Sequence, residues 1–170
     1  MPATKFSVYA DGSSGGNSTG AIGWGWVVLQ DDQVLCAGNG GHPTGTNNVA
    51  ELMGAREGLR ALLSHPAFVA MQGKVYSIEL VSDSQYVLGL ANGAFSATKN
   101  VALANHVREI CSKAIVSTRW VRGHNGHPIN EMCDKLAKAG KYLFQPPKKS
   151  NRGSQRRARR KLIDKKLEEP

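Results

Sequence analysis

Apolar and polar residues alternate one by one near the start of the chain. Within residues 5–10 (KFSVYA), every second residue from Phe6 onward is apolar. A period of two is typical of a β-strand that packs one face on a core. The strand runs into Asp11, and Gly12 directly after it predicts a turn. Taken alone, an Asp-Gly pair of this kind usually does no more than begin a turn.

Two further strands follow close behind the first. A glycine-rich segment leads into a second strand over 22–29, and a third is expected over 34–38. Residues 30–33 have the length of a short hairpin connection. The three strands are therefore predicted to form an antiparallel meander.

The rest of the chain alternates helices with strands. Residues 48–65 have helical spacing, with leucines on one face, and Pro66 ends that helix. The further elements expected are a strand over 75–81, a short helix from 82–84 to about 91, a helix over 101–113, a strand over 115–122 and a helix over 128–141. This order implies parallel crossovers beside the meander. The fold class is therefore α/β, with a five-stranded mixed sheet (three antiparallel and then two parallel strands) flanked by helices.

Length and cysteine content narrow the class of protein. The 170 residues suffice for one domain with a buried core. No apolar run approaches the roughly 18 residues of a spanning helix, so we expect no membrane partner. The N-terminus lacks the apolar core of a secretory signal. Cys36, Cys111 and Cys133 are odd in number and widely spaced, which favours reduced thiols and a cytoplasmic location.

Positive charge is concentrated at the C-terminus. The net charge is +9, and residues 148–170, with ten Lys or Arg and three Asp or Glu, contribute +7 of it. We therefore divide the chain into a folded domain (1–144) and a basic, flexible tail (145–170). The expected partner of the tail is a phosphate backbone; a protein partner or a solubilising role are the alternatives. The tail residues expected to contact nucleic acid are Lys148, Lys149, Arg152, Arg156, Arg157, Arg159, Arg160 and Lys161.

Four carboxylates recur in similar settings along the domain. Asp11 ends the first predicted strand, Glu51 lies in the first turn of the long helix, Asp83 ends the fourth strand, and Asp134 lies on the last helix. Strand ends and adjacent helix starts converge on one rim of such sheets. Four acids there would repel one another unless a cation lay between them. Oxygen ligands suit Mg²⁺, and a pair of such ions can hydrolyse a phosphodiester.

Four segments carry a family resemblance. YADGS, TNNVAELMG, VSDSQYV and GHNGHPINEMCDKLA resemble, in order and spacing, the signature segments of type 1 ribonuclease H. The match spans about residues 6–140. It implies the ribonuclease H-like fold, with 1–144 as the catalytic domain of an RNA–DNA hybrid endoribonuclease that leaves 3′-hydroxyl and 5′-phosphate ends. It also implies two Mg²⁺ ions in the substrate complex, with Mn²⁺ as the other metal that oxygen ligands suit.

The resemblance also implies roles for individual residues. Asp11, Glu51, Asp83 and Asp134 would bind the metal ions and act in catalysis, with Asp11 bridging both ions and Glu51 near the 2′-hydroxyl. His124 resembles the histidine that assists proton transfer or product release. The alternative for His124 is an ordinary solvated loop residue.

The substrate contacts implied by the resemblance are less specific. Asn47 and Gln85 resemble residues that read the minor groove of the hybrid, and Thr46 and Asn100 resemble part of a pocket for a DNA-strand phosphate. The alternative for each is hydrogen bonding within a loop or helix cap. Two further substrate contacts are expected next to Asp11, at Gly12 and Ser13.

The chain departs from the family pattern in two places. Thr44 stands where some members have an arginine, which weakens the phosphate-pocket assignment. Residues 91–100 (ANGAFSATKN) stand where many bacterial members carry a basic, tryptophan-rich protrusion. Our hypothesis is that the basic tail supplies the missing grip on the hybrid.

Three other interpretations are open at this stage. The first is a nuclease of the same fold that cuts DNA, as resolvases and transposases do. The second is a nucleic-acid binder that has lost catalysis. The third is a zinc site formed by His124, His127 and Cys133, which lacks a fourth ligand at an obvious spacing. We expect a monomer, because nothing in the sequence requires an oligomer.

Overall fold

The chain opens with an antiparallel meander. The computed structural model describes residues 3–16 and 20–145, so the predicted tail contacts from Lys148 onward lie outside the described residues. The first three strands are β1 (Thr4–Ser14), β2 (Ile22–Gln30) and β3 (Gln33–His42). Asp31 and Asp32 join β2 to β3, and both have the positive φ that suits a two-residue hairpin turn. The predicted meander is confirmed, although β3 runs four residues beyond its predicted end because it stays paired with β2.

The end of β1 differs from the prediction. The strand does not stop at Asp11 but continues for three residues to Ser14, because β2 remains paired with it throughout. Its other neighbour, β4, pairs with β1 only as far as Tyr9. The turn predicted at Gly12 is therefore wrong. Asp11 lies inside a strand, at the point where β1 projects beyond its parallel partner.

The later elements complete a mixed sheet. They are α1 (Asn47–Ser64), α2 (Pro66–Val69), β4 (Tyr76–Ser82), α3 (Gln85–Ala91), α4 (Val101–Lys113), β5 (Val116–Trp120) and α5 (Pro128–Tyr142). The strand order is β3-β2-β1-β4-β5, and β4 is parallel to both β1 and β5. The predicted fold class is confirmed. The short helix α2 was not predicted, and no helix in the described ranges is long and apolar enough to cross a membrane.

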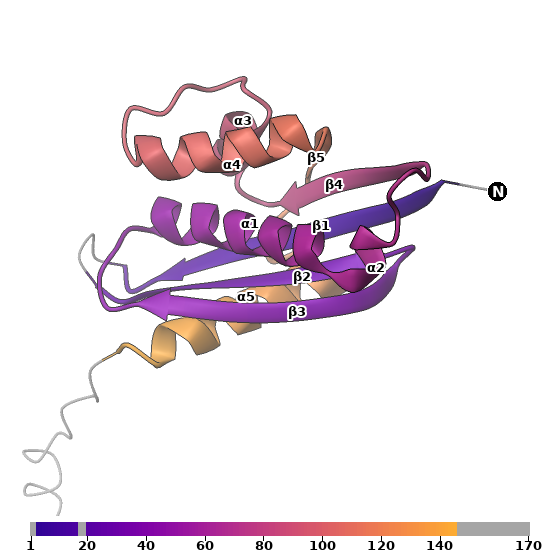
Figure 1. Cartoon of the computed structure of the whole chain (residues 1–170). Helices are drawn as coiled ribbons and strands as arrows, with labels where there is room; N and C mark the ends of the chain where they lie inside the picture. Colours follow the sequence, from indigo (N-terminus) through magenta and orange to yellow (C-terminus); the bar gives the residue numbers. More distant parts are fainter. Residues whose placement is uncertain (1–2, 17–19, 146–170) are drawn as a thin grey trace, which may run out of the picture.

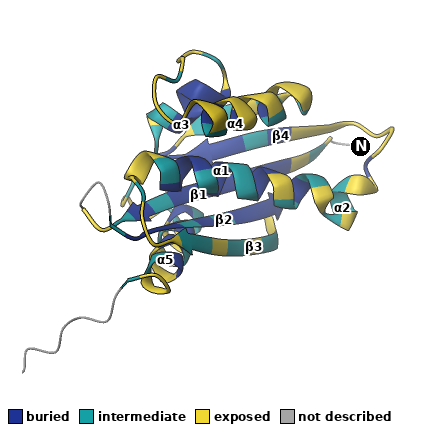
Figure 2. Cartoon of the chain, turned by 60° about the vertical axis from the view of Figure 1, so that its left-hand side comes forward, coloured by how far each residue is buried: buried dark blue, intermediate teal, exposed yellow. Residues whose placement is uncertain are grey.

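Helices cover both faces of the sheet. Helices α1, α3 and α4 lie on one face and α5 lies on the other (Figure 1). Alternate residues of β1 therefore enter two cores: Phe6, Val8 and Ala10 pack towards α1, and Tyr9 packs towards α5. Figure 2 shows the buried residues running along the central strands. The polar face predicted for β1 is thus largely covered, because α5 lies over it.

Glycines allow α5 to come unusually close to the sheet. A Cβ atom at Gly23 would lie 2.1 Å from the backbone oxygen of Ala137, and one at Gly25 would lie 2.4 Å from that of Cys133. Only residues without a side chain permit this approach. The backbone of the helix that carries Asp134 therefore rests directly on the backbone of β2.

Candidate active site

Three carboxylates from three different elements meet at one rim of the sheet. One side-chain oxygen from each of Asp11, Glu51 and Asp83 lies within 4.8 Å of the other two. Asp11 belongs to β1, Glu51 to α1, and Asp83 directly follows β4. Asp11 and Glu51 are each only 6% exposed. The structure thus brings together three of the four acids singled out in the sequence.

Glu51 lies one step further along its helix than predicted. Helix α1 begins at Asn47, with the Thr46 hydroxyl accepting a hydrogen bond from the Val49 amide as its N-cap. Glu51 is therefore the fifth helical residue, just past the first turn. Its side chain still reaches the rim, where Asn47 Nδ2 donates a 3.3 Å hydrogen bond to Glu51 Oε1.

Gly12 explains why Asp11 and Glu51 are neighbours. A Cβ atom at Gly12 would lie 2.4 Å from the amide nitrogen of Glu51 and 2.8 Å from the carbonyl carbon of Ala50. The backbone of β1 is therefore in direct contact with the backbone of α1. Glycine is needed here for this close approach, not for the turn predicted from the sequence.

Asp83 is oriented from two sides. Trp120 Nε1, at the end of β5, donates a 3.0 Å hydrogen bond to the backbone oxygen of Asp83. Asn130 Nδ2, on α5, donates a 3.4 Å hydrogen bond to Asp83 Oδ2. Asn130 is 3% exposed, and its Oδ1 has no hydrogen-bond partner among the described residues.

Sequence reasoning missed Asn130. The available signal was its position four residues before Asp134, which places both side chains on one face of a helix. A buried amide on that face is expected to serve the site.

Two acids of the cluster, Asp11 and Glu51, have raised pKa values. Burial and, after it, the charge of Asp83 raise the pKa of Asp11 to about 7. Burial and the charges of Asp11 and Asp83 raise the pKa of Glu51 to about 9. Glu51 Oε2 is buried without a hydrogen-bond partner in the part of the chain described. Clustered acids with an unpaired buried oxygen fit a hard divalent cation, which prefers oxygen ligands and would compensate their charge.

Asp134 lies beside this cluster but outside it. Its Oδ2 forms an ion pair with Nζ of Lys138, one turn further along α5. The charges of both residues affect the pKa of Asp11, Asp134 raising it and Lys138 lowering it. The four acids thus lie on the same rim, and the fourth already has a positively charged partner.

The loop before α5 holds the two histidines considered from the sequence. His124 is exposed, has a φ of 51°, and makes no hydrogen bond to the acids in the described structure. His127 caps α5 by accepting a hydrogen bond from the Asn130 amide, and its ring lies 5.3 Å from that of Tyr9. No metal-ligating group containing His124, His127 and Cys133 is found in the described residues.

The candidate substrate residues lie at helix starts and in β1. Thr46 caps α1, Gln85 is the exposed first residue of α3, and Asn100 precedes α4 with a φ of 55° and no side-chain cap. The N-terminal ends of α1 and α4 lie at the same end of the molecule (Figure 1). Gly12 and Ser13 are both part of β1, and Ser13 is buried.

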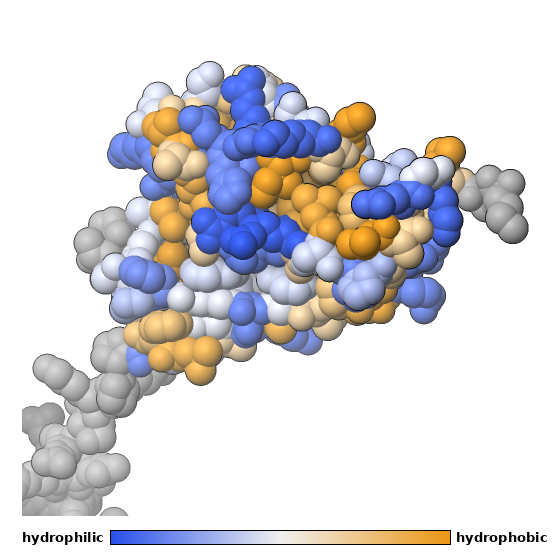
Figure 3. All heavy atoms as spheres, in the orientation of Figure 1, coloured by the Kyte–Doolittle hydropathy of each residue, from blue (hydrophilic) through white to orange (hydrophobic). Residues whose placement is uncertain are grey.

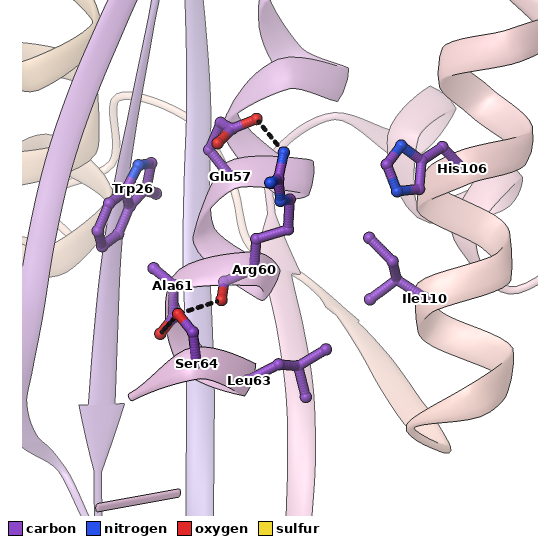
Figure 4. Close-up of a pocket in the computed structure, with 8 residues that line it drawn as sticks. All are labelled: Trp26, Glu57, Arg60, Ala61, Leu63, Ser64, His106 and Ile110. Carbon is purple, nitrogen blue, oxygen red and sulfur yellow. Dashed lines mark hydrogen bonds and ion pairs between the residues drawn. The ribbon is translucent and has the colours of Figure 1, made fainter. Parts of the chain in front are cut away.

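The face over α1 and α4 holds a shallow groove away from the acids. Hydrophilic residues gather over α1 in Figure 3, with apolar surface beside them. Figure 4 shows Trp26 on one side of the groove and His106 on the other, with the 3.8 Å ion pair of Arg60 and Glu57 between them. None of the four acids lines this groove.

Comparison with known proteins gives a consistent result. A sequence model described as RNase H matches residues 3–142. The chain is 36% identical over 157 residues to the ribonuclease HI of Caulobacter vibrioides, covering 84% of this chain and 96% of the relative. It is 27% identical to RNase H1 of the archaeon Halobacterium salinarum, with a TM-score of 0.62 and coverage of 80% and 96%. LC11-RNase H1 in complex with an RNA/DNA hybrid shares the fold, at a TM-score of 0.67 and 17% identity over 81% of this chain and 97% of that one.

Proposed function

Because the chain belongs to the RNase H family, we propose that it cleaves the RNA strand of RNA–DNA hybrids and leaves 3′-hydroxyl and 5′-phosphate ends. The observation that carries the proposal is the meeting of Asp11, Glu51 and Asp83 within 4.8 Å, with an unpaired buried oxygen on Glu51. The structure of LC11-RNase H1, which has the same fold, contains a bound RNA/DNA hybrid, and this supports the same class of substrate here.

In this proposal Asp11, Glu51, Asp83 and Asp134 hold two Mg²⁺ ions, and Mn²⁺ suits the same oxygen donors. When bound, the ions would activate the attacking water and stabilise charge on the leaving oxygen. Asn130 and Trp120 orient Asp83, and Asn47 fixes one oxygen of Glu51. His124, exposed in the loop before α5, assists proton transfer or product release.

Substrate contacts are assigned to residues around the same rim. Asn47 and Gln85 would read the minor groove of the hybrid, and Thr46 and Asn100 would hold a phosphate of the DNA strand. Helix starts present free amide groups, which supports a phosphate site at α1 and α4. Gly12 and Ser13 are proposed to contact substrate next to Asp11, in addition to the packing role that Gly12 has.

The division into a catalytic domain (1–144) and a basic tail (145–170) is also a proposal. Residues 91–100 are too few to form the basic protrusion that many bacterial members have. The tail would bind the hybrid in its place. Each phosphate neutralised contributes about −0.9 to the slope of log K against log salt for duplex DNA. Removing residues 146–170 should therefore flatten the salt dependence of hybrid binding and raise KM, with little change in kcat. If truncation changes neither affinity nor slope, the tail binds something else, such as a protein.

We further propose that the protein acts in the cytoplasm as a monomer. Cys36, Cys111 and Cys133 are all free thiols in the structure, which supports a reducing compartment. Cell fractionation and sedimentation of the purified protein test these two points.

A cleavage assay tests the central proposal. A labelled RNA–DNA hybrid, RNA duplex and DNA duplex of one sequence are incubated with protein and Mg²⁺, with and without chelator. We expect only the hybrid to be cut, only with Mg²⁺, and not by Asp83→Asn. Asp32→Asn is the matched control, because Asp32 lies in the β2–β3 turn, at the opposite end of the sheet from Asp11.

Two results would overturn it. Cleavage of the DNA duplex would favour the DNA-cutting alternative. If the hybrid is not cleaved, and wild type and Asp83→Asn bind it equally well, the protein is a nucleic-acid binder without catalytic activity.

A further inference from the structure

One face of α5 carries a polar stripe directed at the acid rim. Asn130, Asp134 and Lys138 follow one another at intervals of four residues. Asn130 contacts Asp83, and Asp134 contacts Lys138. Other faces of the helix, with Cys133 and Ala137, are buried against the sheet. The stripe therefore brings a lysine to a site otherwise built from acids.

Lys138 forms an ion pair with Asp134, the one of the four acids that lies outside the three-acid cluster. Asp134 is not among the residues whose oxygens lie within 4.8 Å of one another. Its Oδ2 is instead bound to Lys138 Nζ. The Asp134 side chain is 19% exposed and that of Lys138 is 48% exposed, so the ammonium group can move into solvent while the carboxylate stays at the rim.

A divalent cation and an ammonium group compete for such a carboxylate. Both are positively charged, and each would repel the other across the same two oxygens. In the metal-free protein the ammonium group partly neutralises an acidic rim, which is favourable. Once a cation is bound by Asp134, the same ammonium group becomes a source of repulsion.

We propose that Lys138 is a displaceable counter-ion of Asp134, which competes with the divalent cation that Asp134 would hold and so weakens its binding. This inference rests on the proposed function, because it takes Asp134 as a metal ligand. Lys138 is a positioning residue here and not a catalytic one, and it sets the metal concentration at which the site fills.

Direct metal titration tests the competition without substrate. Binding of Mn²⁺ to the full-length protein is followed by electron paramagnetic resonance for wild type and for Lys138→Met. Exposed ion pairs are worth up to about 1 kcal/mol, so we expect Mn²⁺ to bind about 2- to 5-fold more tightly to the variant than to wild type. Lys135→Met is the matched control, because it removes the same charge from an exposed position on the same helix. Lys135→Met should leave the affinity within experimental error.

A double-mutant cycle assigns the effect to Asp134. In an Asp134→Asn background, Lys138→Met should no longer change Mn²⁺ affinity. Equal or weaker Mn²⁺ binding in Lys138→Met would overturn the inference, as would a gain equal to that of Lys135→Met. If the predicted affinity changes appear but no hybrid is cleaved, the proposed function fails and the counter-ion role stands. If cleavage occurs without those changes, the counter-ion role fails alone.

Discussion

Replacing Asp11 by asparagine should make the metal-free protein more stable, although it removes a proposed metal ligand. The side chain is buried next to Glu51 and Asp83, so its negative charge is unfavourable in the folded state. Asparagine has nearly the same shape. Its oxygen can still accept the 2.8 Å hydrogen bond from the Gly12 amide.

The size of the effect follows from the pKa of Asp11. Burial and the charge of Asp83 raise it from 3.8 to about 7, which is roughly a thousandfold increase in proton affinity. At about 1.4 kcal/mol for each tenfold change, ionising Asp11 costs the folded protein at most about 4 kcal/mol. An asparagine amide also loses hydration when buried, so we expect about half of this, roughly 2 kcal/mol, to be recovered. For a domain of this size that corresponds to an increase in Tm of about 4–8 °C.

The stabilisation should depend on pH. Below about pH 4 the Asp11 carboxyl is protonated in both the folded and the unfolded chain, so wild type and Asp11→Asn should differ little. Between about pH 4 and 7 the folded wild type binds more protons than the unfolded chain, so its stability falls as pH rises. The raised pKa of Glu51 continues this decline towards pH 9 in wild type, and to a smaller extent in Asp11→Asn, which lacks the charge of Asp11 that helps to raise the pKa of Glu51.

Urea unfolding at pH 4 and pH 8, with chelator, measures this difference directly. At pH 8, Mg²⁺ at 100 times its Kd for wild type should raise the free energy of unfolding of wild type by about 2.7 kcal/mol. The same Mg²⁺ concentration should stabilise Asp11→Asn less, because the variant lacks one of the proposed ligands. The reasoning is refuted if, at pH 8 without metal and at equal m-values, Asp11→Asn is no more stable than wild type.

Three further predictions concern positions around the site and the fold. Gly12→Ala should lower the free energy of unfolding by about 1–3 kcal/mol and weaken Mn²⁺ binding, because the new methyl group collides with the backbone at Glu51; unchanged urea unfolding would contradict it. Ile115→Gly should raise Tm by a few degrees, because Ile115 is 87% exposed and has a φ of 52°, which is strained for a β-branched residue; Ile115→Ala should gain less. Asn130→Ala should weaken Mn²⁺ binding or cleavage about 10-fold, as loss of a residue that orients a ligand does; wild-type values for both would remove Asn130 from the site.

Local patterns predicted the described elements except α2, because these elements are amphipathic or bounded by a clear signal. The spacing of leucines and Pro66 gave both ends of α1 to within one residue, and the hairpin at Asp31 and Asp32 followed from segment length. The three clustered acids could be expected on one rim because strand ends and adjacent helix starts meet there in such sheets, although Asp11 lies inside β1 and not at its end.

The errors arose where a distant element decides the outcome. An Asp-Gly pair predicts a turn, but pairing with β2 keeps Gly12 in a strand and α1 requires its lack of a side chain. Only one face of β1 was expected to pack on a core, but α5 covers the other face as well, which carries Tyr9. The contact of Asn130 with Asp83 depends on how α5 is rotated about its axis, which the sequence alone did not reveal. The ion pair of Asp134 with Lys138 lies within α5, and its spacing of four residues could have predicted it.

The contact of main chain with main chain at Gly12, Gly23 and Gly25 has a consequence for how this protein can change. The two helices that supply acids, α1 and α5, are held at a height above the sheet that is set by van der Waals contact between backbone atoms, and not by the volume of the intervening side chains. Substitutions among the leucines and valines of the interior can therefore raise or lower the melting temperature and leave the spacing of the carboxylates as it is. An engineer could redesign the hydrophobic interior for heat resistance and keep the reaction, provided that these glycines stay, together with Gly41 and Gly140, which bring α5 equally close to β3.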